Sequence, residues 1–201
     1  MAPLIPPPDF SKIRLPSGPL SARGMPPCRA VGRAEGLVVD ATAGRGGDAF
    51  LLAVSGFEVL AIERHPEVFA ALEEGLRRAE SDPKLARWLG GRLRLVHGDA
   101  RVILPGLGDI AAVHVDPMFP PKRKTAAPKK DIQLLRSLVG EDHDAAELLA
   151  VARAAAPRVA VKRSRHAEAL APEPDTVIRG KLGRYDVYLR TDRSISPGPK
   201  C

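Results

Sequence analysis

From residue 36 onward, short apolar runs alternate with amphipathic stretches. The apolar runs are rich in branched side chains and have the length of buried strands, at residues 37–40, 59–63, 92–97, 111–116 and 159–162. Helical spacing of apolar residues fills the intervals at 47–55, 66–80 and 147–156. This alternation of strand and helix predicts an α/β fold with a mostly parallel sheet.

The two ends of the chain differ from this central region. Residues 177–178 and 185–189 flank Gly180-Lys181-Leu182-Gly183, which predicts an antiparallel hairpin at the end of the sheet. Residues 1–35 hold eight of the twenty prolines, and we expect an extended or irregular N-terminal arm there, not a packed unit. The predicted domain therefore spans residues 36–192, and residues 193–201 form a frayed tail.

A glycine-rich loop follows the first predicted strand, and its sequence suits a nucleotide-like ligand. Gly44-Arg45-Gly46-Gly47-Asp48-Ala49 fits the dinucleotide pattern G-x-G-x-x-A and leads into a helix, whose N-terminus presents free N–H groups. Glu63 ends the next strand, where an acid accepts hydrogen bonds from ribose hydroxyls. Adenosine from either NAD or S-adenosylmethionine satisfies this pattern, and a simple tight turn is the structural alternative.

Acidic residues around the loop favour S-adenosylmethionine. Asp40 and Asp48 are poor neighbours for a pyrophosphate but suit an ammonium and a sulfonium. Asp99 ends the third strand, where it can meet the adenine or ribose, and Asp116 ends the fourth. An NAD(P)-dependent oxidoreductase remains an alternative that rests on the glycine pattern alone.

The element Asp116-Pro117-Met118-Phe119 is the candidate catalytic site. The carboxylate of Asp116 and the carbonyl of Pro117 can accept the two N–H groups of an exocyclic amine, and Phe119 can stack on a planar base. Catalysis would then consist mainly of positioning for an in-line displacement. The alternative is an Asp-Pro turn with Phe119 in the core.

Basic residues supply a candidate RNA-binding surface. The chain has 31 Lys and Arg against 24 Asp and Glu, a formal charge of +7, which fits a polyanionic partner. The expected phosphate contacts directly follow the Asp-Pro element or end the fifth strand: Lys122, Arg123, Lys124, Lys129, Lys130, Lys162 and Arg163. A solvated, mobile loop is the alternative for residues 121–130.

Several classes of protein are disfavoured. No stretch approaches eighteen apolar residues, and the N-terminus lacks the pattern of a signal peptide, so we expect a cytoplasmic protein without a membrane span. The two cysteines, Cys28 and Cys201, and the five histidines show no metal-ligand spacing. His97 and His114 lie in predicted strands and are expected to be packed or hydrogen-bonded, and Trp88 is expected in the core.

A set of motifs resembles the ribosomal RNA small-subunit methyltransferase J family, from about Arg29 to Leu189. The motifs are Asp40-Ala41-Thr42-Ala43-Gly44, Asp48-Ala49-Phe50, Leu60-Ala61-Ile62-Glu63-Arg64, Gly75-Leu76, Val115-Asp116-Pro117-Met118-Phe119-Pro120, Ser137-Leu138-Val139-Gly140 and Val161-Lys162-Arg163. The run Asp-Pro-Met-Phe-Pro with a downstream Leu-Val-Gly is specific, whereas the glycine loop by itself is not.

The resemblance implies a Rossmann-like methyltransferase with a seven-stranded sheet. It implies methyl transfer from S-adenosylmethionine to N2 of a guanine in small-subunit 16S ribosomal RNA, free or in a ribosomal particle, in the bacterial cytoplasm. The implied donor contacts are Gly47, Asp48, Glu63, Arg64, Asp99, Ala100 and Asp116. The family usually has Ser-Ser at Asp99-Ala100 and a longer N-terminal subdomain. A non-catalytic RNA-binding protein with the same fold is a third alternative.

Overall fold

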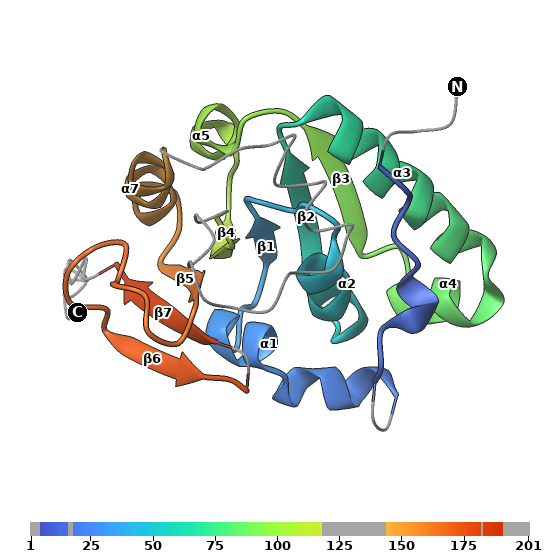
Figure 1. Cartoon of the computed structure of the whole chain (residues 1–201), viewed down its shortest axis with the longest axis horizontal. Coiled ribbons are helices and arrows are strands. Elements are labelled where there is room, and N and C mark those ends of the chain that lie inside the picture. The colour runs from blue at the N-terminus through green and yellow to red at the C-terminus, as the bar shows by residue number, and fades with distance from the viewer. Residues whose placement is uncertain (1–4, 16–17, 118–143, 182, 191–201) are drawn as a thin grey trace, which may run out of the picture.

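The computed structural model describes residues 5–15, 18–117, 144–181 and 183–190. Its strands form one sheet in the order β3-β2-β1-β4-β5-β7-β6 (Figure 1). The strand bounds are β1 Leu37–Asp40, β2 Glu58–Glu63, β3 Leu93–His97, β4 Ile110–Val115, β5 Arg158–Arg163, β6 Thr176–Arg179 and β7 Arg184–Leu189. β1 to β5 pair in parallel, and β7 pairs antiparallel with both β5 and β6. The mostly parallel seven-stranded sheet and its terminal hairpin are therefore confirmed.

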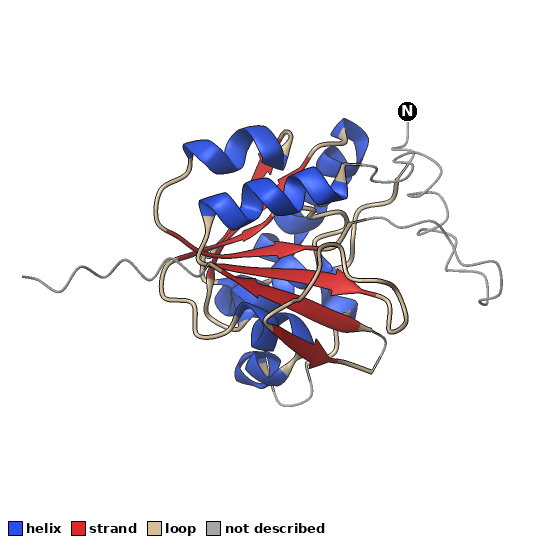
Figure 2. Ribbon diagram, turned by 90° about the vertical axis from the view of Figure 1, so that its left-hand side faces the viewer, coloured by secondary structure: helices blue, strands red, loops and turns tan. Residues whose placement is uncertain are grey.

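Helices cover both faces of this sheet (Figure 2). One hydrophobic cluster lies beneath α1 (Pro26–Val31), α2 (Gly47–Val54), α3 (Pro66–Ser81) and α4 (Pro83–Leu89). The other lies beneath α5 (Ala100–Ile103), the 3-10 turn η3 (Leu104–Gly106) and α7 (Ala145–Ala155). Neighbouring strand residues such as Val38 and Val39 belong to opposite clusters because side chains alternate across a strand.

The N-terminal segment is packed, and the expectation of an unpacked arm is wrong. It contains the 3-10 turns η1 (Phe10–Lys12) and η2 (Pro19–Gly24) and the helix α1, and it runs along α3 and then past α2 (Figure 1). Phe10 is 3% exposed and stacks on Phe50, with 4.8 Å between ring centroids. Pro19 and Pro26 stand in the first turns of η2 and α1, where a fixed φ favours helix formation.

Glycine at one position lets this segment approach α3. A Cβ added at Gly75 would lie 2.4 Å from Cγ of Pro8, a distance that no packed side chain tolerates. The N-terminal residues therefore cover one flank of the domain that holds the glycine loop. Within the described residues, no helix has the length and apolar content needed to cross a membrane.

Candidate active site

The glycine loop connects β1 to α2 at the carboxyl edge of the sheet. Gly44 and Gly46 have φ values of 53° and 70°, in the left-handed region that favours glycine. A Cβ at Gly46 would come within 2.4 Å of Cδ1 of Leu72, so α3 packs directly against the loop. A Cβ at Gly47 would meet no atom within 4 Å, which shows that the space beside the first turn of α2 is open.

Glu63, at the end of β2, holds the loop in this shape. Its Oε2 accepts a hydrogen bond from the backbone N–H of Gly44 and its Oε1 accepts one from His65, both at 2.8 Å. The side chain is buried, and desolvation raises the pKa of Glu63 above its ordinary value. Nδ1 of His65 is buried and has no hydrogen-bond partner among the described residues, which leaves one polar atom unsatisfied beside Glu63.

An ion-pair network of alternating charge, formed by Asp40, His114, Asp48, Lys162 and Asp116, links β1, β4, α2 and β5. Nδ1 of His114 lies 3.1 Å from Oδ1 of Asp40, and its Nε2 lies 3.4 Å from Oδ2 of Asp48. Nζ of Lys162 lies 2.7 Å from Oδ2 of Asp48 and 2.8 Å from Oδ2 of Asp116. The network thus brings together the acid that ends β1, the acid of the first turn of α2 and the acid of the Asp-Pro element.

The network fixes the protonation state of its members. Burial by itself would lower the pKa of His114, but the carboxylates of Asp40 and Asp48 raise it to about 10, so the imidazole is charged at neutral pH. Burial would raise the pKa of Asp48, but His114 and Lys162 hold it well below its usual range. Desolvation raises the pKa of Asp116 while Lys162 opposes that rise, and Lys162 itself is held charged by the two carboxylates it contacts.

Asp116 is also positioned through its backbone. Its N–H donates a 2.6 Å hydrogen bond to Oγ1 of Thr42, which ties the end of β4 to the loop after β1. Tyr185 on β7 reaches the same place, with its hydroxyl 3.4 Å from Oδ2 of Asp48. Pro117 follows directly, whereas Phe119 and the basic residues Lys122, Arg123, Lys124, Lys129 and Lys130 lie outside the described residues.

The remaining predicted donor contacts surround the ends of β2 and β3. Arg64 forms an ion pair with Asp144 at 2.6 Å. Asp99 caps α5 by accepting from the N–H of Arg101, and both of its oxygens contact the Arg101 guanidinium, which lowers the pKa of Asp99. Ala100 is the first residue of α5 and is buried.

The two basic residues predicted to end β5 lie in different environments. The ammonium of Lys162 contacts two carboxylates, as described above, although the side chain is 38% exposed. Arg163 is buried and donates from Nε to the carbonyl of Glu168 at 2.9 Å, in the connection between β5 and β6. These contacts favour an internal role for both side chains.

Sequence reasoning missed the partnership of His114. The expectation that it is packed or hydrogen-bonded is confirmed, but its place between two acids was not predicted. Because β1 and β4 are neighbours, His114 lies directly opposite Asp40 in the sheet register. The available signal was a polar ring within an apolar strand, two residues before Asp116 and so on the same face of β4.

Comparison with known proteins identifies the family. Residues 20–190 match the family described as "Putative SAM-dependent methyltransferase". The ribosomal RNA small subunit methyltransferase J of Shewanella loihica is 47% identical over 174 residues, which cover 84% of this chain and 67% of the relative. The enzyme of the same name from Shewanella amazonensis is 48% identical over 174 residues, covering 84% and 70% of the two chains.

The chain belongs to the ribosomal RNA small subunit methyltransferase J family. A solved SAM-dependent methyltransferase from Neisseria gonorrhoeae has the same architecture, with a TM-score of 0.67 and 34% identity; the match covers 91% of this chain and 71% of that one. The protein is accordingly a methyltransferase that uses S-adenosylmethionine. Membership in the methyltransferase J family removes the oxidoreductase alternative.

The site fits the donor of the methyltransferase J family. Open space beside Gly47 would give a ligand access to the first turn of α2, which carries Asp48, and Asp116 shares Lys162 with Asp48. Both acids suit a ligand that carries a sulfonium and an ammonium. Glu63 contacts the loop at Gly44, and Nδ1 of His65, which has no partner among the described residues, follows it in the chain; hydroxyls of a ribose would find polar partners there.

Proposed function

We propose that this protein transfers a methyl group from S-adenosylmethionine to the exocyclic N2 of a guanine in 16S ribosomal RNA of the small subunit. The family resemblance makes guanine 1516 the expected target. The substrate is the free RNA or a ribosomal particle, and the proposed location is the cytoplasm. The observation that carries the proposal is the placement of Asp116, an acid after β4 that shares Lys162 with the acid of the glycine-loop helix.

Residues of the glycine loop and of the neighbouring strand ends are proposed to bind different parts of the donor. Gly44, Gly46 and Gly47 allow close approach of the backbone, and Asp40 and Asp48 supply negative charge. The proposed contacts to ribose and adenine are Glu63, Arg64, Asp99 and Ala100. When bound, S-adenosylmethionine would supply a methyl group whose bond to the positively charged sulfur breaks as the bond to nitrogen forms, leaving a neutral thioether, so no nucleophilic side chain is needed.

Asp116 is the proposed catalytic residue. Its Oδ2 accepts a hydrogen bond from Lys162, while Oδ1 has no partner among the described residues and is free to accept an N–H of the guanine amine. The carbonyl of Pro117 is the proposed acceptor for the second N–H, and Phe119 the proposed stacking partner of the base. The new C–N bond leaves the nitrogen with an excess proton, which Oδ1 of Asp116 is placed to take up as the amine returns to neutrality.

Lys162 stabilises the carboxylate form of Asp116 that this step requires. Because the ammonium also contacts Asp48, Lys162 sets the distance between the donor side and the base side of the site. The proposed RNA contacts of Lys122, Arg123, Lys124, Lys129 and Lys130 remain predictions. Lys162 and Arg163 are better assigned to the contacts described above than to RNA phosphates.

Transfer of tritiated methyl to RNA tests the function. Purified protein is incubated with labelled S-adenosylmethionine and either 16S RNA or small subunits from a strain that lacks this gene, and the modified nucleotide is mapped. We expect Asp116→Ala to lose at least about a hundredfold in rate at saturating donor, as for removal of a positioned general base, and also to bind the donor more weakly, because one carboxylate of the network is removed. Glu58→Gln, which removes an exposed acid at the start of β2, is the charge-matched control.

Two results would contradict the proposal. Retained turnover in Asp116→Ala would remove the catalytic assignment. Tight binding of both donor and RNA without methylation of any nucleotide would favour the non-catalytic RNA-binding alternative.

A further inference from the structure

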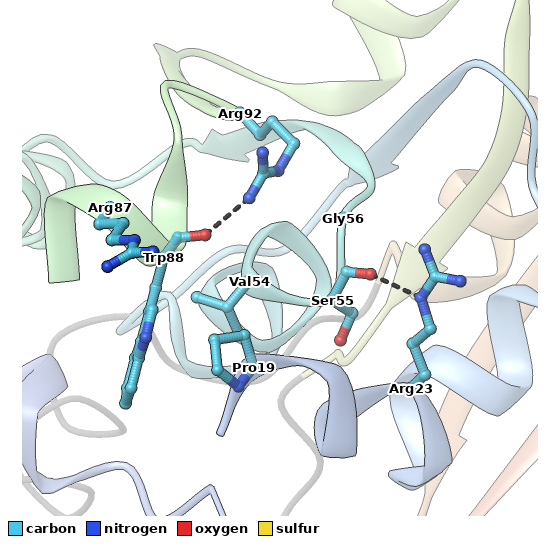
Figure 3. A pocket seen from close by; sticks show the side chains of 8 residues that line it. All are labelled: Pro19, Arg23, Val54, Ser55, Gly56, Arg87, Trp88 and Arg92. Atoms are coloured by element: carbon cyan, nitrogen blue, oxygen red, sulfur yellow. Dashed lines mark hydrogen bonds between the residues drawn. The ribbon is translucent and has the colours of Figure 1, made fainter. Parts of the chain in front are cut away.

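A hollow of about 430 Å³ lies away from the active site (Figure 3). Its lining comes from η2, the end of α2, α4 and the residue before β3: Pro19, Arg23, Val54, Ser55, Gly56, Arg87, Trp88 and Arg92. Helix α2 starts at the glycine loop and ends at this hollow, and eight helical residues span about 12 Å. The hollow is therefore at the opposite edge of the sheet from Asp116.

Two of the three arginines are fixed in place by helix ends. Nε of Arg23 donates to the carbonyl of Ser55 at 2.9 Å, after the last turn of α2. Nε of Arg92 donates to the carbonyl of Ala53 at 3.0 Å, and its Nη2 donates to the carbonyl of Trp88 at 2.6 Å. The carbonyls of Ser55 and Trp88 lie at helix ends, where carbonyls lack intrahelical partners, whereas that of Ala53 also accepts from the N–H of Gly56. The arginine bonds also hold each guanidinium in one orientation.

The guanidinium groups of Arg23 and Arg92 still have N–H donors that can bind a ligand. Among the described residues, both terminal nitrogens of Arg23 and Nη1 of Arg92 have no hydrogen-bond acceptor. Arg87 is exposed and forms no hydrogen bond or ion pair with the described part of the chain. The lining contains no acid, so nothing within the hollow neutralises the three guanidinium groups.

Trp88 adds a flat aromatic surface to this cationic site. It is half-buried, so the expectation of a core residue is only partly met. Nζ of Lys84 lies 4.7 Å from the ring centroid and covers one face. In Figure 3 the Trp88 ring lies next to Val54 at one side of the hollow, and Arg23 lies next to Ser55 at the other side. The ring and the oriented guanidinium groups of Arg23 and Arg92 thus line one hollow, a combination of groups that suits a base and a backbone phosphate.

We propose that this hollow is a second RNA-contact site, which takes a single-stranded segment of the substrate distant from the methylated base. The guanidinium groups bind a backbone phosphate and the Trp88 ring stacks on a base. This inference rests on the proposed function, since it assumes a ribosomal RNA substrate. An acidic protein segment would use the charges but would gain less from the ring, so RNA is the better match.

Intrinsic fluorescence tests the site directly because Trp88 is the only tryptophan in the chain. A single-stranded oligoribonucleotide from the target region is titrated into the full-length protein at several salt concentrations. We expect quenching, with an affinity that falls as salt rises. Arg87→Glu should weaken binding at least about tenfold and reduce the salt slope by about one. Arg179→Glu, an exposed site on β6 at the far end of the sheet, makes the same charge change and should have a smaller effect.

Methylation kinetics test the second RNA-contact site separately from the proposed methyltransferase activity. We expect Arg87→Glu to raise KM for RNA, while kcat at saturating RNA and the affinity for the donor stay unchanged. Trp88→Phe, which keeps an aromatic ring, should bind RNA more tightly than Trp88→Ala. If the wild-type protein methylates RNA but Arg87→Glu and Arg179→Glu behave alike, the second site is refuted and the function stands. If RNA quenches Trp88 but no nucleotide is methylated, the function fails and the site stands. Quenching by poly-glutamate as strong as that by RNA would overturn the RNA assignment.

Discussion

Removing the charge of His114 should change both the stability of the protein and its dependence on pH. His114 and Asp40 are almost fully buried, at 1% exposure each, and Asp48 completes the pair of acids around the imidazole. His114→Leu leaves these carboxylates without their common partner. Breaking a buried ion pair in this way costs about 3–5 kcal/mol of unfolding free energy.

The pH dependence follows from the raised pKa. The imidazole titrates at 6.5 in the unfolded chain and at about 10 in the folded protein, so the folded state binds one more proton between these values. The stabilisation by His114 is therefore complete below about pH 6.5 and is lost as pH rises towards about 10. In this window the free energy of unfolding should fall by about 1.4 kcal/mol per pH unit.

Other titratable groups near the network change their charge outside the pH range in which His114 titrates. Lys162 and Tyr185, which face the network from β5 and β7, both have raised pKa values and titrate above it. Burial raises the pKa of the Cys28 thiol to about 11, from an ordinary value of 9.0. Cys28 therefore contributes to the pH dependence of stability only near the upper end of this pH range. Measurements between about pH 7 and 9 thus isolate His114 within the network.

Urea unfolding at these pH values, followed by circular dichroism, is the assay. The wild-type free energy of unfolding should fall by about 3 kcal/mol from pH 7 to 9, whereas His114→Leu and His114→Gln should show little change. Gln keeps an amide donor near Asp40, so it should lose less stability at pH 7 than Leu does. Parallel pH curves for the wild type and both variants would refute the protonated imidazolium.

Two further predictions concern the site and the N-terminal segment. Lys162→Met should move the acidic limb of the methylation pH profile upward by about 1–3 units, because its ammonium lowers the pKa of Asp116; an unmoved limb would exclude this role. Phe10→Ala should lower the free energy of unfolding by about 3–5 kcal/mol in urea titrations, since the ring is buried and stacks on Phe50. A loss below about 1 kcal/mol, typical of surface changes, would indicate that this segment is not part of the core.

The gathering of acids at one edge was predictable because parallel strands end together. Asp40 and Asp116 follow two buried runs, and Asp48 lies in the helix that the glycine loop begins. These positions depend only on local patterns and on the rule that the strands share a direction. The number of strands was not readable in this way and came from the family resemblance.

Which charged side chains contact each other in the site could not be predicted from local sequence patterns. His114 faces Asp40 only because β4 lies next to β1, and Lys162 reaches Asp48 and Asp116 only because β5 lies next to β4. Strand order is a property of the whole fold. The charge of Lys162 predicted an outward contact to RNA, whereas its neighbours in the folded sheet direct it inward.

Two local signals in the sequence were overlooked. Asp82 accepts hydrogen bonds from the N–H groups of Lys84 and Leu85, and Pro83 occupies the first turn of α4, which together form a regular helix start. In the N-terminal segment, the high proline content by itself predicts an irregular chain. The position of proline before short apolar stretches instead marks the beginnings of η2 and α1.

The charge balance of the ion-pair network explains why this glycine loop suits a sulfonium donor. Three carboxylates and two cations leave one net negative charge. A pyrophosphate would add negative charge next to Asp48 and Asp116, which Coulomb repulsion disfavours in a partly buried site. S-adenosylmethionine carries one net positive charge, so its binding next to Asp48 and Asp116, as proposed, would bring the site to neutrality. Donor affinity should therefore fall with ionic strength, and Asp48→Asn should weaken donor binding more than Glu58→Gln does.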